Sequence, residues 1–104
     1  DAGCGTYDKL HANTTDAALE KHLPVVKVKK DMVQAKVGEN DHPMDEDHYI
    51  TWVYLETTRG GSLRVLKPGD QPQVEFRLSD GERPLAVYEY CNRHGLWKAE
   101  LAQE

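Results

Sequence analysis

The sequence predicts a single all-β domain, arranged as a sandwich or a barrel. Several runs alternate apolar and polar residues with a period of two, as half-buried strands do. Turn residues separate these runs at intervals of about 8–12 residues, which is typical of sandwiches and barrels. At 104 residues the chain has the size of one domain. A chain of this length can bury a core without the help of disulfides.

Seven candidate strands follow one another along the chain. The strongest is residues 49–55, because it is rich in β-branched and aromatic side chains. In residues 74–78 the apolar positions alternate with Glu75 and Arg77, which indicates a strand with one buried face. Only residues 16–21 look helical, and they make barely one turn. The remaining candidate strands are residues 25–29, 32–37, 63–66, 85–90 and 96–101.

Turns and chain ends set the domain organisation. Clusters of Gly, Asn, Asp and Pro predict turns, at residues 38–40, 59–61, 67–70 and 79–82. Residues 1–13 lack any periodicity, so we expect an N-terminal arm there. Residues 14–104 then form the β-sandwich domain, with no internal repeat or linker.

Charge and hydropathy argue against two classes of partner. The net charge of −5 disfavours nucleic acid, since phosphate binding needs a basic surface. No apolar run approaches the roughly 20 residues of a membrane span. We expect a cytoplasmic location. A periplasmic location stays open because the chain begins at Asp1 without a methionine.

Five side chains stand out as metal ligands. All of them fall in predicted loops or at strand ends, the places where a rigid sandwich presents binding groups: His22, His42, His48, Cys91 and His94. Four bonds already fill a structural zinc site. Five ligands therefore indicate a larger coordination shell, or a redox metal with an open sixth position. His11 lacks such a context, and we expect it to be solvated.

Other roles for the cysteines remain open at this point. Cys91 and His94 could act as thiolate and base in nucleophilic catalysis, which would leave three histidines unused. A disulfide between Cys4 and Cys91 is conceivable in an oxidising compartment. Met44 is a conceivable soft ligand, although a methionine in a loop more often packs.

Five segments resemble the motifs of a known family. Residues 20–25, Glu-Lys-His-Leu-Pro-Val, resemble the Glu-Lys-His-x-Pro element of superoxide reductases. Residues 41–44 and 48–52 are similar to the central histidine element of that family. Residues 66–70 and 90–97 match the rest, in order and with few gaps. Together these motifs are highly specific, and the resemblance runs from about residue 13 to residue 98.

The resemblance implies a fold, a metal and a reaction. The fold is an immunoglobulin-like β-sandwich of about seven strands. The cofactor is a mononuclear iron with the four histidines in a plane, Cys91 axial and the sixth position open. Backbone N–H groups near Arg93 and His94 would bond the sulfur. The reaction is one-electron reduction of superoxide to hydrogen peroxide.

The same resemblance implies outer residues and partners. Lys21 would attract superoxide and help to position it, and Glu20 would bind ferric iron after turnover. The expected electron donor is a small redox protein such as rubredoxin. A homodimer or homotetramer is expected, because family members commonly form one.

The N-terminus departs from the desulfoferrodoxins, which carry a second iron held by four cysteines. Cys4 is the single cysteine among the first 21 residues, and one thiolate cannot build that site. The chain is therefore expected to be a one-iron form, similar to the neelaredoxins. Two alternatives remain: a cupredoxin-like electron carrier, although no methionine follows His94, and a binding module stabilised by zinc.

Overall fold

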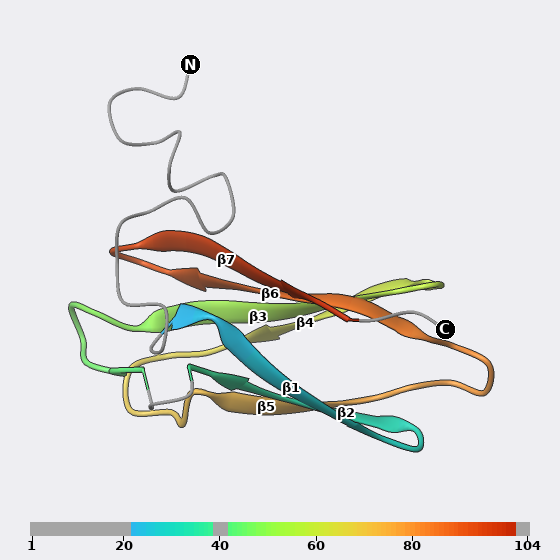
Figure 1. Cartoon of the computed structure of the whole chain (residues 1–104). Coiled ribbons are helices and arrows are strands. Elements are labelled where there is room, and N and C mark those ends of the chain that lie inside the picture. Colours follow the sequence, from blue (N-terminus) through green and yellow to red (C-terminus); the bar gives the residue numbers. More distant parts are fainter. Residues whose placement is uncertain (1–21, 39–41, 102–104) are drawn as a thin grey trace.

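The computed structural model describes residues 22–38 and 42–101, and within these ranges the chain forms a two-layer sandwich (Figure 1). Seven strands make up the described part. They follow the alternating runs of the sequence closely: β1 Pro24–Lys29, β2 Met32–Val37, β3 Ile50–Thr57, β4 Gly60–Val65, β5 Gln73–Arg77, β6 Pro84–Cys91 and β7 Gly95–Glu100. The predicted all-β class and all seven candidate strands are confirmed. The predicted arm, the helical turn at residues 16–21, Cys4 and His11 lie outside the described residues.

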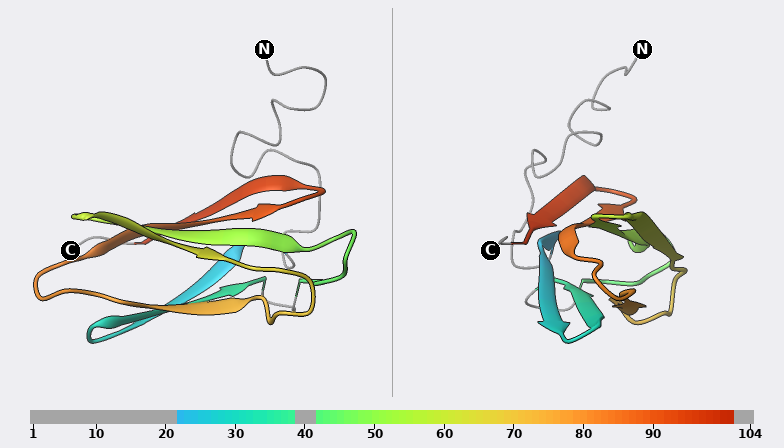
Figure 2. Two further views of the ribbon diagram at one scale, coloured as in Figure 1. Left: turned by 180° about the vertical axis from the view of Figure 1, so that it is seen from behind. Right: turned by 90° about the vertical axis from the view of Figure 1, so that its right-hand side faces the viewer.

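The strands divide into two antiparallel sheets. One sheet has the order β1-β2-β5 and the other has the order β4-β3-β6-β7. Figure 2 shows the two sheets facing each other. This is an immunoglobulin-like arrangement in which the fourth strand joins the sheet of the third. The implied fold is therefore confirmed.

The core lies between the sheets and follows from strand alternation. On β2 every second residue is buried, and β3 and β6 supply the facing layer. The fully buried apolar side chains include Val33, Val37, Ile50, Val53, Val87 and Trp97. Because strands are held by these alternating contacts, the five strand ends that carry the site are fixed relative to one another.

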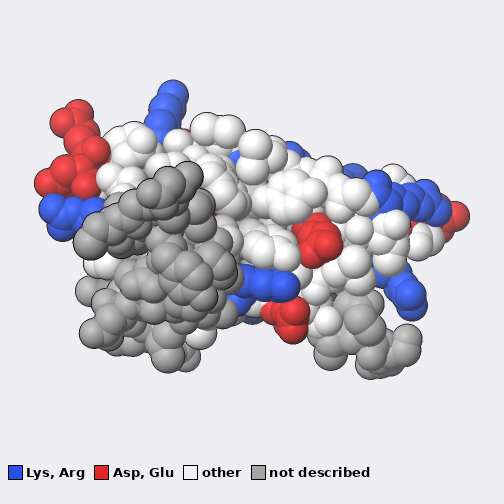
Figure 3. Space-filling view, turned by 90° about the horizontal axis from the view of Figure 1, so that it is seen from above, with Lys and Arg blue, Asp and Glu red and all other residues white. Residues whose placement is uncertain are grey.

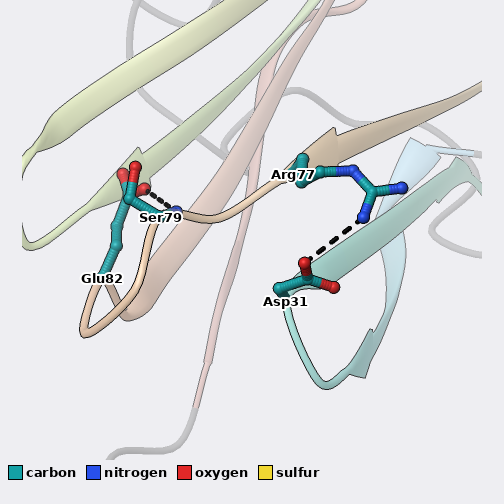
Figure 4. Close-up of polar contacts among 4 residues, drawn as sticks. All are labelled: Asp31, Arg77, Ser79 and Glu82. Carbon is teal, nitrogen blue, oxygen red and sulfur yellow. Dashed lines mark hydrogen bonds and ion pairs between the residues drawn. The ribbon is translucent and has the colours of Figure 1, made fainter.

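Polar contacts close the opposite end of the sandwich (Figure 4). Arg77 at the end of β5 forms an exposed ion pair with Asp31 in the β1–β2 turn, at 3.3 Å. In the β5–β6 loop, the Ser79 N–H donates to Glu82 at 2.8 Å. This bond and the Thr57 hydroxyl lower the pKa of the Glu82 carboxyl. These contacts hold the loops in place at this end of the sandwich. The described histidines all lie at the other end.

The outer face of the four-stranded sheet is mostly uncharged. Cross-strand register places Val65, Trp52, Tyr90 and Leu96 in one row across all four strands. Figure 3 looks onto this face, where uncharged side chains form a band between charged ones. The exposed fraction is greatest on the edge strand β4, at 75% for Val65. No helix within the described ranges has the length and hydropathy needed to span a membrane.

Candidate metal centre

Five strand ends meet at one pole of the sandwich and carry the candidate ligands. His22 lies just before β1, and His42 and His48 lie in the connection between β2 and β3. Cys91 is the last residue of β6, and His94 lies in the turn before β7. The structure therefore brings together all five side chains that the sequence singled out. Glu20 and Lys21 lie outside the described residues.

The four imidazole rings occupy the corners of a square. Neighbouring rings are edge to face, with centroids 4.7 Å apart for His22 and His42, 4.8 Å for His42 and His48, 5.2 Å for His48 and His94, and 4.8 Å for His94 and His22. The diagonal pair His22 and His48 is wider, at 6.4 Å. This arrangement gives each imidazole two neighbours and one opposite partner.

The nitrogen spacing fits a single metal ion. His22 Nε2 lies 3.0 Å from His94 Nδ1 and 3.2 Å from His42 Nε2. Bonds of about 2.1 Å from a metal to imidazole nitrogen, set at right angles, place neighbouring nitrogens about 3.0 Å apart. The ligand atoms of His22, His42, His48 and Cys91 all lie within 4.8 Å of one another. His94 Nδ1 lies 3.9 Å from the Cys91 sulfur.

A backbone contact and burial prepare His42 to act as a ligand. Its Nδ1–H donates to the Pro43 carbonyl at 2.7 Å, which leaves Nε2 directed at the other imidazoles. Burial lowers the pKa of His42 to about 4, although the Pro43 carbonyl opposes this shift. The ring is therefore neutral at pH 7, the form in which imidazole binds a metal.

His48 presents an orphaned nitrogen to the same centre. Its Nε2 is buried and finds no hydrogen-bond partner among residues 22–38 and 42–101. Burial lowers the pKa of His48, and nearby His94 and Arg93 lower it further. Buried polar atoms are almost always paired. A nitrogen left in this way indicates that its partner is a bound ion.

The sulfur is buried and surrounded by backbone donors. Cys91 is a free cysteine with no exposed surface. Burial raises the pKa of its thiol, and the backbone N–H groups of His94 and Arg93 act in the opposite direction by bonding the sulfur. This lowering of the thiol pKa agrees with the expectation that N–H groups near these two residues lie beside the sulfur. A bound cation would favour the thiolate further.

Two more residues lie beside the site: Trp97, which the sequence suggested as part of the core or a pocket wall, and Glu89, which was not predicted from sequence. Trp97 is fully buried and stacks on His22, with ring centroids 4.8 Å apart. Glu89, which pairs with Trp97 across β6 and β7, is also fully buried. Within the described part of the chain, neither the Glu89 carboxyl nor the Trp97 indole nitrogen has a hydrogen-bond partner. Strand alternation contained the signal, because Val87, Glu89 and Cys91 share one face of β6.

Burial changes the ionisation of Glu89. It raises the pKa of this carboxyl to about 9, so the group is protonated at neutral pH. A neutral carboxyl next to the sulfur avoids placing two negative charges in the same dry pocket.

Met44 anchors the loop that carries His42 and His48. Its sulfur accepts a hydrogen bond from the Ile50 N–H at 3.4 Å, and its carbonyl accepts one from Gly69 at 2.9 Å. Met44 also packs against the core. Its role in the structure is to pack and anchor the loop.

The ligand atoms limit which metals the site can bind. Imidazole suits zinc, copper, iron and nickel, and a thiolate favours softer metals. Four imidazoles and one sulfur exceed the four ligands of a closed zinc site. They leave one position of a six-coordinate ion open to a small ligand.

Comparison with known proteins identifies the family of this arrangement. The sequence model described as desulfoferrodoxin matches residues 14–100. A desulfoferrodoxin of Syntrophotalea carbinolica is 47% identical over 98 residues, which cover 93% of this chain and 76% of that protein. The chain thus spans about three quarters of the length of that relative.

Solved structures agree with this match. The superoxide reductase of Treponema pallidum superposes with a TM-score of 0.84 at 44% identity, covering 88% of this chain and 75% of that one. The one-iron superoxide reductase of Giardia intestinalis gives a TM-score of 0.68 at 30% identity, covering 81% of this chain and 99% of that one.

Proposed function

This chain belongs to the desulfoferrodoxin family, and from that membership we propose that it is a superoxide reductase. The reaction takes one superoxide, one electron and two protons and yields one hydrogen peroxide. No dioxygen is released, which distinguishes the reaction from dismutation. The observation that carries this proposal is the convergence of four imidazoles and one buried sulfur at a single pole of the sandwich.

We propose that the five side chains hold a mononuclear iron. His22, His42, His48 and His94 would supply nitrogen ligands, and Cys91 would supply the sulfur. Bound iron would provide the electron that reduces superoxide. Burial keeps the imidazole of His42 unprotonated, and the bond from its Nδ1–H to the Pro43 carbonyl orients the ring. The backbone N–H groups that bond the Cys91 sulfur limit how much electron density it donates.

Lys21 and Glu20 are proposed to act on the substrate side. Lys21 directly precedes His22 in sequence. The chain carries a net charge of −5, and Asp45, Glu46 and Asp47 are exposed in the loop between two ligands, so a superoxide anion is repelled overall. A local cation is needed for capture, and Lys21 is proposed to supply it. Glu20 is proposed to close the open position of the oxidised site.

The partners and location are also proposals. A small redox protein of the rubredoxin kind would re-reduce the site, which stopped-flow kinetics with reduced rubredoxin would test. A homodimer or homotetramer would show as a multiple of the 11.8 kDa chain mass in light scattering. Cytoplasmic location would be tested by cell fractionation.

The two rival functions fit the site less well. A cupredoxin-type copper site uses two histidines, one cysteine and a weak axial ligand, so it leaves two of these imidazoles without a role. A structural zinc needs four ligands, so one of the five candidate ligands would have no role. Metal analysis together with a visible spectrum of the oxidised protein separates the three, since only ferric iron bound to thiolate gives both iron and colour.

Replacing the sulfur tests the ligand set. We expect Cys91→Ser to abolish the visible thiolate band of the oxidised protein and the reduction of superoxide. Cys4→Ser is the matched control and should keep both. Colour and turnover that survive in Cys91→Ser would refute this coordination.

Replacing Lys21 tests anion capture. We expect Lys21→Ala to slow the reaction with superoxide at low ionic strength and to flatten its salt dependence, because ions screen charge steering. Lys27→Ala, which removes an exposed lysine on β1, should leave the salt dependence as it is. Pulse radiolysis at several salt concentrations gives both rates. An unchanged rate in Lys21→Ala would remove this residue from the mechanism.

A further inference from the structure

The turn between β6 and β7 contains a residue that contacts both sides of a candidate ligand. Asn92 lies between Cys91 and His94 in sequence, and it makes three hydrogen bonds to the segment that carries His48. Its backbone N–H donates to the Tyr49 carbonyl at 3.1 Å. Its side-chain oxygen accepts from the Tyr49 N–H at 2.9 Å. Its side-chain nitrogen donates to the Asp47 carbonyl at 3.1 Å.

These contacts use both ends of the amide. The oxygen faces a donor and the nitrogen faces an acceptor, so only one orientation of the side chain satisfies both. Asp47 and Tyr49 are the two residues that flank His48. The amide of Asn92 therefore bridges the backbone before and after this histidine, from a residue 43 positions away from Tyr49.

His48 depends on such a bridge because no strand holds it. The residue precedes β3, which begins at Ile50. Its own backbone pairs with Asp45 within the same loop. That pairing shapes the loop but does not tie it to the sulfur. Asn92 ties the loop directly to the turn that carries Cys91 and His94.

We propose that Asn92 is a positioning residue that holds His48 against the Cys91–His94 turn, so that the fourth imidazole stays on the metal. This proposal rests on the proposed function for the identity of the metal. Asn92 itself touches neither the metal nor the substrate. Its loss would let His48 move away while the Cys91 sulfur and its backbone donors remain in place.

The test compares Asn92→Ala with Gln34→Ala in the full-length, iron-loaded protein. Gln34 is the matched control, because its side-chain amide also makes a hydrogen bond, 2.9 Å to Glu75, but on the opposite sheet. We expect Asn92→Ala to release iron to a chelator about 10- to 100-fold faster, as residues that support metal ligands typically do. The ferric electron paramagnetic resonance spectrum should change in rhombicity. Gln34→Ala should match the wild type in both measurements.

A partial variant separates the two side-chain bonds. Asn92→Asp keeps the acceptor for the Tyr49 N–H but loses the donor to Asp47. Its rate of iron release should therefore fall between those of the wild type and Asn92→Ala. An Asn92→Asp protein identical to the wild type would overturn the two-sided bridge.

Amide hydrogen exchange supplies a readout that does not depend on which metal is bound. The Tyr49 N–H should lose at least about tenfold of its protection in Asn92→Ala and keep it in Gln34→Ala, since exchange reports local opening. If Tyr49 protection, iron release and the ferric spectrum all match the wild type, Asn92 does not position His48. A wild-type protein that takes up a metal other than iron would overturn the proposed function alone, and Tyr49 exchange would still decide the role of Asn92.

Discussion

At the scale of single residues, Glu89 is buried although its sequence suggests a solvated side chain. A glutamate in an alternating strand suggests a solvated side chain, yet Glu89 has no exposed surface and no hydrogen-bond partner among the described residues. It lies on the same face of β6 as Cys91. Such a group is tolerated in a dry pocket only in its neutral form, which explains why burial raises its pKa to about 9.

Replacing this carboxyl should stabilise the protein increasingly as pH rises. The folded pKa of Glu89 lies above the ordinary carboxyl value of 4.5, so the stability it contributes is full below pH 4.5 and is lost as pH rises through 9. Glu89→Gln cannot ionise. Its advantage over the wild type in free energy of unfolding should grow by roughly 1 kcal/mol per pH unit between about pH 5 and 9.

Urea unfolding of the metal-free proteins measures this advantage. Glu75→Gln, at an exposed position on β5, is the control and should show no growing difference. A constant difference between Glu89→Gln and the wild type across that range would contradict the buried neutral state of Glu89.

At the scale of single elements, the edge strand β4 depends on a close backbone approach. All six of its residues are exposed, and it pairs only with β3 among the described strands. The side chain of Tyr54 on β3 lies against Gly61, where a Cβ atom would collide with the tyrosine ring and lie 2.6 Å from the Leu55 carbonyl oxygen. Glycine is therefore required at position 61, because there is no room for a side chain.

Adding one methyl group here should loosen the β3–β4 hairpin. Gly61→Ala must displace Tyr54 or the strand, and overpacking of this kind costs about 1–3 kcal/mol. Ser62→Ala, at the next residue of the same exposed strand, should change the free energy of unfolding by no more than about 0.5 kcal/mol. Chemical denaturation of both variants measures the difference. A Gly61→Ala protein as stable as Ser62→Ala would contradict the close packing of Tyr54 on this strand.

At the scale of the whole molecule, the candidate metal centre takes its ligands from both sheets. His22 precedes β1 of the three-stranded sheet, whereas Cys91 and His94 belong to the four-stranded sheet. The two sheets otherwise meet mainly through apolar side chains between them. A metal ion held by these residues would therefore join the sheets at one pole.

Removing the metal should lower the stability of the whole domain. A ligand that binds only the folded state stabilises it by about 4 kcal/mol when its free concentration is 1,000 times its dissociation constant. We expect a chelator to lower the melting temperature in calorimetry and re-addition of ferrous iron to restore it. The melting temperature of Cys91→Ser should respond much less to the chelator. An equal response in both proteins would show that the metal stabilises the fold through other residues.

Much of this protein follows from local sequence. Strand alternation depends on neighbours two residues apart, so the seven strands and the buried faces of β2 and β5 were predictable. The type and spacing of His22, His42, His48, Cys91 and His94 indicated a metal site before any coordinates. Their positions at strand ends predicted that they converge, because a rigid sandwich gathers its loops at two poles.

Only the tertiary structure decided the rest, because it depends on contacts between distant positions. The order of the imidazoles around the square rests on pairs such as His22 and His94, 72 residues apart. The bridge from Asn92 to the His48 loop spans 43 positions, and the burial of Glu89 depends on the sheet packed above it. Periodicity places Glu89 on the same face of β6 as Cys91, but it does not encode these long-range contacts, since they arise when the two sheets close over the same pole.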